Sequence, residues 1–256
     1  MERPEPHRGA APHGVTRLRE DDPHRAIRRL AWPTALAMSV QTLYNLVDAV
    51  WVARLGADPL AAVGLFFPFM FIAMALATGV GVGGGSAVSR SIGEDDREAS
   101  RAVAAHSVML VLLAAVAFSL PLALGARGLF AAIGAGDALE PAVAYGQVMF
   151  AGMGLVLFSH VAMALLRGEG DARRPMVAMV VGALLNIVLD PVLIFDTLGP
   201  VPGAGLGVAG AAWATVISMT LTAGLLVRWL LLGGEAWVTP GWRSFRPRGR
   251  VVGEIG

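Results

Sequence analysis

Residues 176–196 read MVAMVVGALLNIVLDPVLIFD, an apolar run interrupted by Asn186 and Asp190. A helix of this length rises about 1.5 Å per residue, which is enough to cross the roughly 30 Å hydrocarbon core of a bilayer. Asp190 is therefore an ionisable group inside a predicted membrane span, where it costs about 2.5 to 3.5 kcal/mol. Such a residue usually faces a cavity or a partner and serves an ion or proton pathway.

Further runs of the same kind indicate that the whole chain is a membrane protein. Of its 256 residues, 55% are hydrophobic, and they gather in long runs separated by short polar loops, which is rare in soluble domains. The pattern predicts an all-α membrane protein with six transmembrane helices in one bundle over residues 30–232. The predicted spans are residues 30–53, 60–89, 102–125, 142–166, 176–196 and 207–232.

The basic residues, all twenty of them arginines, fall on alternate connections between these spans. Seven precede residue 30, three lie in 90–101, three lie in 167–174 and five lie from residue 228 onward. The other side carries only Arg54 and Arg127. The positive-inside rule therefore predicts a multi-pass protein of the cell membrane with both termini in the cytoplasm.

The two ends of the chain are polar. Residues 1–29 are rich in Pro, Arg and acids without an apolar stretch, so we expect a disordered cytoplasmic tail. Residues 233–256 read as a basic cytoplasmic linker. The arginines are dispersed among acidic residues, which disfavours nucleic acid as a partner. The sequence has no cysteine, so it offers no thiolate ligand or thiol nucleophile.

The second half of the span 30–53 is unusually polar. Gln41, Asn45 and Asp48 follow the i, i+4, i+7 spacing of one helical face, and Tyr44 lies beside them. A polar stripe inside a membrane must face protein or water, so Gln41, Tyr44 and Asn45 are candidates for lining a cavity. Pro33 is expected in the first turn of this helix, where its missing N–H does little harm.

Asp48 and Asp190 are predicted to lie at the same depth. Asp48 precedes Arg54 by six residues and Asp190 precedes Asp196 by six, which places each carboxyl about 9 Å from the same end of the bundle. Thr215, in a span that runs the other way, is about 12 Å from that end. All three side chains can share one layer if their helices are neighbours.

This layer offers oxygen atoms to a small cation. Asn186 and Asp190 are four residues apart and share a helical face. Pro191 cannot donate to the carbonyl of Ile187, which leaves that oxygen available for a cation or water. Oxygen ligands suit a hard ion such as Na+, whereas two buried carboxyls that repel each other can equally hold a proton. Both coupling ions remain open at this point.

Two other interpretations are weaker. Carboxyls that only tie helices together would gain about 0.6 kcal/mol per interhelical bond, less than the insertion cost of a charge. Residues 79–85 contain a formal GxGxxG, but this motif follows an apolar helix instead of a strand, which favours close helix packing or a flexible kink over dinucleotide binding. No nucleophile–base pair, metal cluster or nucleotide loop indicates an enzyme or a cofactor.

Several stretches, in order along the chain, resemble the multidrug and toxic compound extrusion (MATE) transporters. Each is short, but together they extend from residue 30 to residue 232. They are residues 30–33, 43–48, 60–64, 89–90, 93–96, 166–171, 186–191 and 207–215.

The resemblance implies a V-shaped exporter of twelve helices in two six-helix bundles, which works by alternating access and is driven by Na+ or H+. In the branch with an acidic first bundle, the cation site uses an Asp of the first helix, an Asn and an Asp of the fifth and a Thr of the sixth. These roles correspond here to the following residues: Asp48, Asn186, Asp190 and Thr215. Pro33 corresponds to a proline at which the first helix bends, and Pro191 is the second predicted bend.

The chain differs from that family in having six predicted helices instead of twelve. We expect an N-terminal lobe that exports organic, often cationic, compounds together with a second lobe or a second copy. The alternatives are a truncated membrane fragment or partner-binding bundle that does not transport, and a lipid or polysaccharide flippase. A flippase is expected to have several cationic residues in its cavity, and the predicted spans have none except at their ends.

Overall fold

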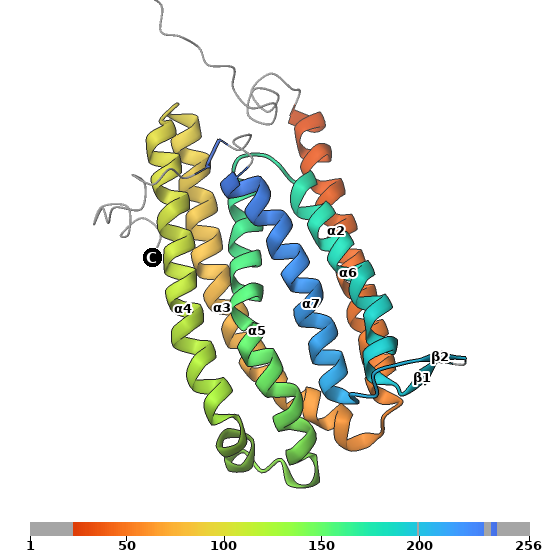
Figure 1. Cartoon of the computed structure of the whole chain (residues 1–256). Coiled ribbons are helices and arrows are strands. Elements are labelled where there is room, and N and C mark those ends of the chain that lie inside the picture. The colour runs from red at the N-terminus through yellow and green to blue at the C-terminus, as the bar shows by residue number, and fades with distance from the viewer. Residues whose placement is uncertain (1–22, 199, 233–236, 240–256) are drawn as a thin grey trace, which may run out of the picture.

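The computed structural model describes residues 23–198, 200–232 and 237–239 (Figure 1). Long helices joined by short turns form one bundle, as the hydrophobic runs predicted. A two-strand hairpin, β1 (Thr197–Leu198) and β2 (Val201–Pro202), was not predicted. The long helices are α2 (Pro23–Ala53), α3 (Ala57–Gly93), α4 (Arg97–Ala132), α5 (Leu139–Gly168), α6 (Arg173–Ile194) and α7 (Val208–Val227). Two short elements are η1 (Gly136–Ala138) and the π-helix η2 (Arg228–Leu232).

Most of the helices extend past their predicted spans because polar end residues continue the backbone hydrogen-bond ladder. One of these extensions changes a prediction, because α2 begins at Pro23 instead of residue 30, so residues 23–29 are helical where a tail was expected. Pro33 consequently lies in the interior of α2 and not in its first turn, which corrects that prediction. The remainder of the predicted tail and most of the predicted linker lie outside the described residues.

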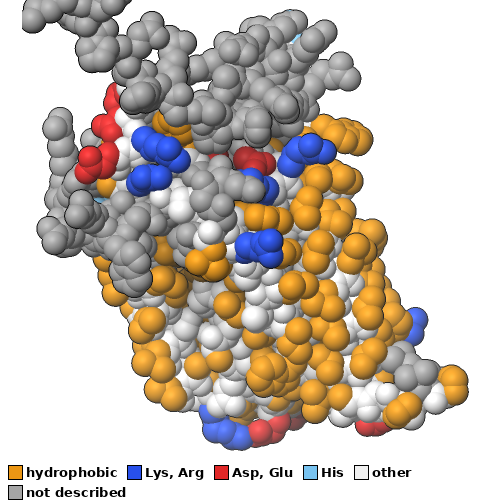
Figure 2. Space-filling model, turned by 45° about the horizontal axis from the view of Figure 1, so that its top comes forward, with side chains coloured by type: hydrophobic (Ala, Val, Ile, Leu, Met, Phe, Trp, Pro, Cys, Tyr) orange, Lys and Arg blue, Asp and Glu red, His pale blue; other side chains and the backbone are white. Residues whose placement is uncertain are grey.

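Five of the described helices, α3 to α7, are long and apolar enough to cross a membrane. The helix α2 is also long enough, but Gln41, Asn45 and Asp48 make its second half more polar. Figure 2 shows a broad apolar surface between regions of charged side chains, which fits a bundle that spans a bilayer.

The helix α5 forms the centre of the bundle. It packs against α3, α4 and α7, and α7 packs in turn against α6, which carries α2 on its other side (Figure 1). Aromatic rings of α3, α4 and α5 interlock around Phe150, whose ring centroid lies 5.1 Å from that of Phe66 and 6.1 Å from that of Phe130. These contacts hold α3, α4 and α5 together as a compact half, and the contact between α5 and α7 connects this half to a second group formed by α2, α6 and α7.

Glycines bring α3 and α5 unusually close together at one end. A Cβ on Gly168 would lie 2.6 Å from the backbone oxygen of Gly85, and a Cβ on Gly85 would lie 3.1 Å from that of Ala164. The Ser89 hydroxyl donates to the Gly168 carbonyl at 2.7 Å across the same contact. The glycine-rich segment therefore serves close helix packing, as predicted.

Candidate cation-binding site

The helices α2, α6 and α7 meet where the sequence predicted a polar layer. The buried face of α6 includes Gly182, Asn186 and Asp190 at four-residue intervals, so the two polar side chains continue the stripe that packs against the bundle. Asp190 is 0% exposed, Asn186 is 1% exposed and Thr215 of α7 is 6% exposed. Three side chains with oxygen atoms are thus enclosed between α6 and its neighbours.

Asp48 of α2 and Asp190 of α6 are direct neighbours. Their carboxyl groups lie within hydrogen-bond range of each other. Oδ1 of Asp48 is buried without a hydrogen-bond partner among the described residues. Two carboxylates this close cannot both remain ionised without a proton or a cation to offset their repulsion. The pair is therefore chemically suited to take up a positive charge.

Asn186 connects this pair to Thr215. In the amide orientation that satisfies both of its polar atoms, the Asn186 nitrogen donates to Asp190 Oδ2 at 2.9 Å, and its oxygen accepts from the Thr215 backbone N–H at 3.2 Å. The Thr215 hydroxyl oxygen lies 3.4 Å from that same amide atom. The amide therefore orients the Asp190 carboxyl and connects α6 to α7.

Two tyrosines complete the surroundings of the pair. Tyr44 of α2 hydrogen-bonds to the Thr215 side chain and lies near Asp48. Tyr145 of α5 is 6% exposed and interacts electrostatically with both carboxyls. Sequence reasoning missed Tyr145 because no spacing rule connects α5 to α2 or α6. One signal was available, since the chain has only two tyrosines and both lie inside predicted spans.

The polar stripe on α2 divides into two parts. Asp48 faces α6, whereas Asn45 is exposed and Gln41 is half-buried. The Gln41 side-chain amide donates to Asn45 Oδ1 at 3.1 Å, so these two residues bond to each other and not to the carboxyl pair. Gln41, Asn45 and Asp48 therefore share one helical face only approximately. Because an α-helix has 3.6 residues per turn, residues four apart are rotated relative to each other around the helix axis.

The prolines do not interrupt their helices. The helix α2 continues through Pro33, and α6 continues through Pro191 to Ile194. Their role as bends therefore stays a prediction.

The ligand atoms gathered here are oxygens. Among the described residues, no group of three His, Cys, Asp or Glu side chains could hold a metal ion. The layer has two carboxyls, one amide and hydroxyl groups, a set that suits a hard monovalent cation or a proton better than a transition metal.

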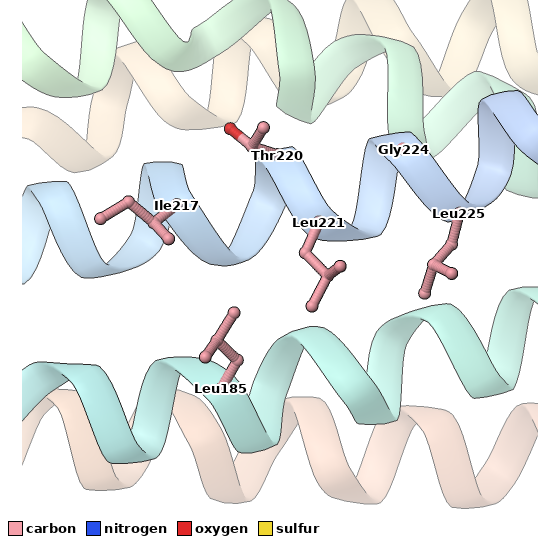
Figure 3. Close-up of a pocket in the computed structure, with 6 residues that line it drawn as sticks. All are labelled: Leu185, Ile217, Thr220, Leu221, Gly224 and Leu225. Carbon is pink, nitrogen blue, oxygen red and sulfur yellow. The ribbon is translucent and has the colours of Figure 1, made fainter.

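An apolar groove lies elsewhere, between α6 and α7 (Figure 3). It has a volume of about 500 Å³ and no charged side chain in its lining, so it fits hydrocarbon better than an ion. Its lining residues are Leu185, Ile217, Thr220, Leu221, Gly224 and Leu225.

Comparison with known proteins identifies the architecture. The profile of the MatE family matches residues 33–192, more than half of the sequence. The chain belongs to the MatE family. A MATE transporter solved in an outward-facing conformation superimposes on this MatE chain with a TM-score of 0.86 and 44% identity, covering 95% of this chain and 52% of the solved one.

Curated relatives of this MatE chain are transporters. A FAD transporter of Shewanella oneidensis is 28% identical over 195 residues, which cover 76% of this chain and 42% of the relative. The multidrug export protein MepA of Staphylococcus aureus is 27% identical over 241 residues, covering 90% and 50%. The chain thus spans about half the length of the curated relatives it matches. Its family and its apolar helices make it a multi-pass membrane protein.

Proposed function

We propose that this chain is the cation-binding lobe of a MatE antiporter that exports organic compounds. The observation that carries the proposal is the direct contact between the Asp48 and Asp190 carboxyls inside an apolar bundle. Two neighbouring acids inside membrane-spanning helices are energetically costly and usually serve an ion pathway. The multidrug export function named for relatives such as MepA supports the direction of transport.

Uptake of Na+ or H+ by the carboxyl pair would change the attachment of α2. The helix α2 packs mainly against α6 and makes few contacts with α3 and α7, so the Asp48–Asp190 contact lies at its principal attachment. An empty pair repels and loosens this attachment, whereas a bound cation draws α2 toward α6. Ion binding thereby shifts α2 between two positions, as alternating access requires.

The same helix would connect the ion to the exported compound. Gln41 is half-buried and Asn45 is exposed on α2, about one to two turns from Asp48. In our proposal they line a cavity shared with a second six-helix lobe, and movement of α2 changes their position. Pro33, inside α2, is the proposed hinge for this movement. The membrane lipid and an organic small molecule are the partners, and the predicted linker 233–256 leads toward the second lobe.

Cation binding can be tested on the purified chain in lipid nanodiscs. We expect saturable binding of radioactive Na+ or, failing that, proton uptake in a pH-jump measurement. Asp190→Asn and Asp48→Asn should each reduce either signal at least tenfold. Asp58→Asn, which changes an exposed acid in the first turn of α3, is the matched control and should retain it. Absence of both signals in the wild-type chain, or their survival in Asp48→Asn and Asp190→Asn, would exclude the proposed site.

Export can be measured in cells that lack their own drug exporters. Drug efflux should depend on Na+ or pH and should be lost in Asp190→Asn at matched membrane expression. Because a second lobe is part of the proposal, the same comparison is repeated with a co-expressed second lobe from a relative. Efflux that is equal in wild type and Asp190→Asn would contradict cation coupling.

A further inference from the structure

At the end of the bundle remote from the carboxyl pair, a buried acid holds the chain segment that follows α7. Glu169 caps α5 in the α5–α6 turn and is only 5% exposed. Its Oε2 accepts a hydrogen bond from the Val238 backbone N–H at 3.3 Å, and its carboxyl also accepts from the backbone N–H of Trp237. No periodicity in the sequence connects these residues.

The segment is also buried and contacts α4. Trp237 is 8% exposed and Val238 is 0% exposed, so both are part of the core although they follow the last helix. The Arg97 guanidinium of α4 lies over the Trp237 ring, 5.0 Å from its centroid. The seat therefore combines an apolar pocket, a cation–π contact and two backbone hydrogen bonds that end on one carboxyl.

We propose that Glu169 is a latch that holds residues 237–238 against the α5–α6 turn and loosens as the pH rises. The latch determines how firmly the chain is fastened where it leaves the bundle after α7. The proposal does not depend on the cation site, because Asp190 lies about 25 Å along α6 from the turn at Arg173.

The charges around Glu169 determine the sign of the effect. Burial raises the pKa of Glu169 from 4.5 to about 7, and the negative charge of Asp171 adds to this increase. The hydrogen bonds from Val238 and Trp237 and the charge of Arg174 lower the pKa but do not outweigh burial. Arg97 lies over the Trp237 ring and is not among the groups that shift the pKa of Glu169.

Docking of the segment therefore takes up a proton. An acid whose pKa is higher in the docked than in the undocked state binds its proton more tightly when docked, so docking weakens as the pH rises from 4.5 toward 7 and beyond. If the undocked carboxyl has its ordinary value of 4.5, the docking equilibrium falls about tenfold between pH 6 and pH 8.

The cysteine-free chain permits a direct test. A nitroxide label on Thr239→Cys, attached before the pH is varied, reports the mobility of the segment by electron paramagnetic resonance in nanodiscs. We expect the ratio of mobile to immobile label to increase about tenfold from pH 6 to pH 8. Glu169→Gln retains an acceptor but cannot ionise, so its label should stay immobile at both values. Trp237→Ala should make the label mobile at both.

Two controls separate this latch from other effects. Asp171→Asn changes a neighbouring acid in the same turn and should leave a clear pH response. Asp190→Asn disables the proposed cation site. In this variant the label should show the same pH response as in the labelled Thr239→Cys chain that retains Asp190. Label mobility that does not change between pH 6 and pH 8, or a Glu169→Gln variant that responds like its parent, would overturn the proposal.

Discussion

Asp48 of α2 lies against Asp190 of α6, so two helices separated by three others along the chain share one carboxyl pair. The contact lies where α2 makes its principal attachment to the bundle. A proton or cation at this position would therefore alter both a local charge and the packing of an entire helix.

Thr215→Val should weaken cation binding by roughly tenfold. The change preserves the shape of the side chain but removes the hydroxyl that bonds to Tyr44 and lies beside the Asn186 amide. Thr220→Val on the same helix is the control, because the Thr220 hydroxyl donates to the Val216 carbonyl of its own helix. Binding of radioactive Na+ and proton uptake measure the effect, and equal losses in the two variants would contradict a specific role for Thr215.

Gly168→Ala should destabilise the bundle by about 1 to 3 kcal/mol, because its Cβ would press on the backbone of Gly85. Gly125→Ala in α4 meets nothing within 4 Å and should be neutral or slightly stabilising. The two variants are compared by thermal unfolding in detergent, with the folded fraction measured by size-exclusion chromatography. Equal midpoints would mean that the α3–α5 contact can relax without loss.

The thermal stability should decrease with rising pH through Glu169. Its pKa is raised to about 7 in the folded chain, so the folded state binds the proton more tightly, and the stabilisation present below pH 4.5 is lost as the pH rises to 7. Over this pH range the free energy of unfolding is expected to decrease by about 3 kcal/mol. Glu169→Gln should remove this part of the pH dependence in melting curves from pH 5 to pH 8. If the melting temperatures of the wild type and of Glu169→Gln decrease equally with pH, the pH dependence comes from other groups.

The ion pair between Arg127 and Glu140 should contribute little. Both side chains are largely exposed, at 62% and 70%, so water screens their attraction. Arg127→Gln is expected to lower the stability by less than about 1 kcal/mol in the same unfolding assay. A decrease as large as that of Gly168→Ala would show that the pair fastens α4 to α5 more strongly than its exposure suggests.

Local patterns in the amino-acid sequence were sufficient to predict the long helices and the matching depth of the two carboxyls. Hydropathy and helical rise are local properties, so the apolar runs and the six-residue offsets of Asp48 and Asp190 could be converted into spans and a layer. The same local reasoning placed the start of α2 too late, because a polar stretch continues a helix as readily as it forms a tail.

Which side chains face one another depends on how the helices pack, and this became visible in the three-dimensional structure. It brought Tyr145 to the carboxyl pair, separated Asn45 from Asp48 on α2, and placed Trp237 and Val238 on Glu169. These contacts depend on the rotation of each helix about its axis and on the packing of elements far apart in the chain. No periodicity within a single segment contains that information.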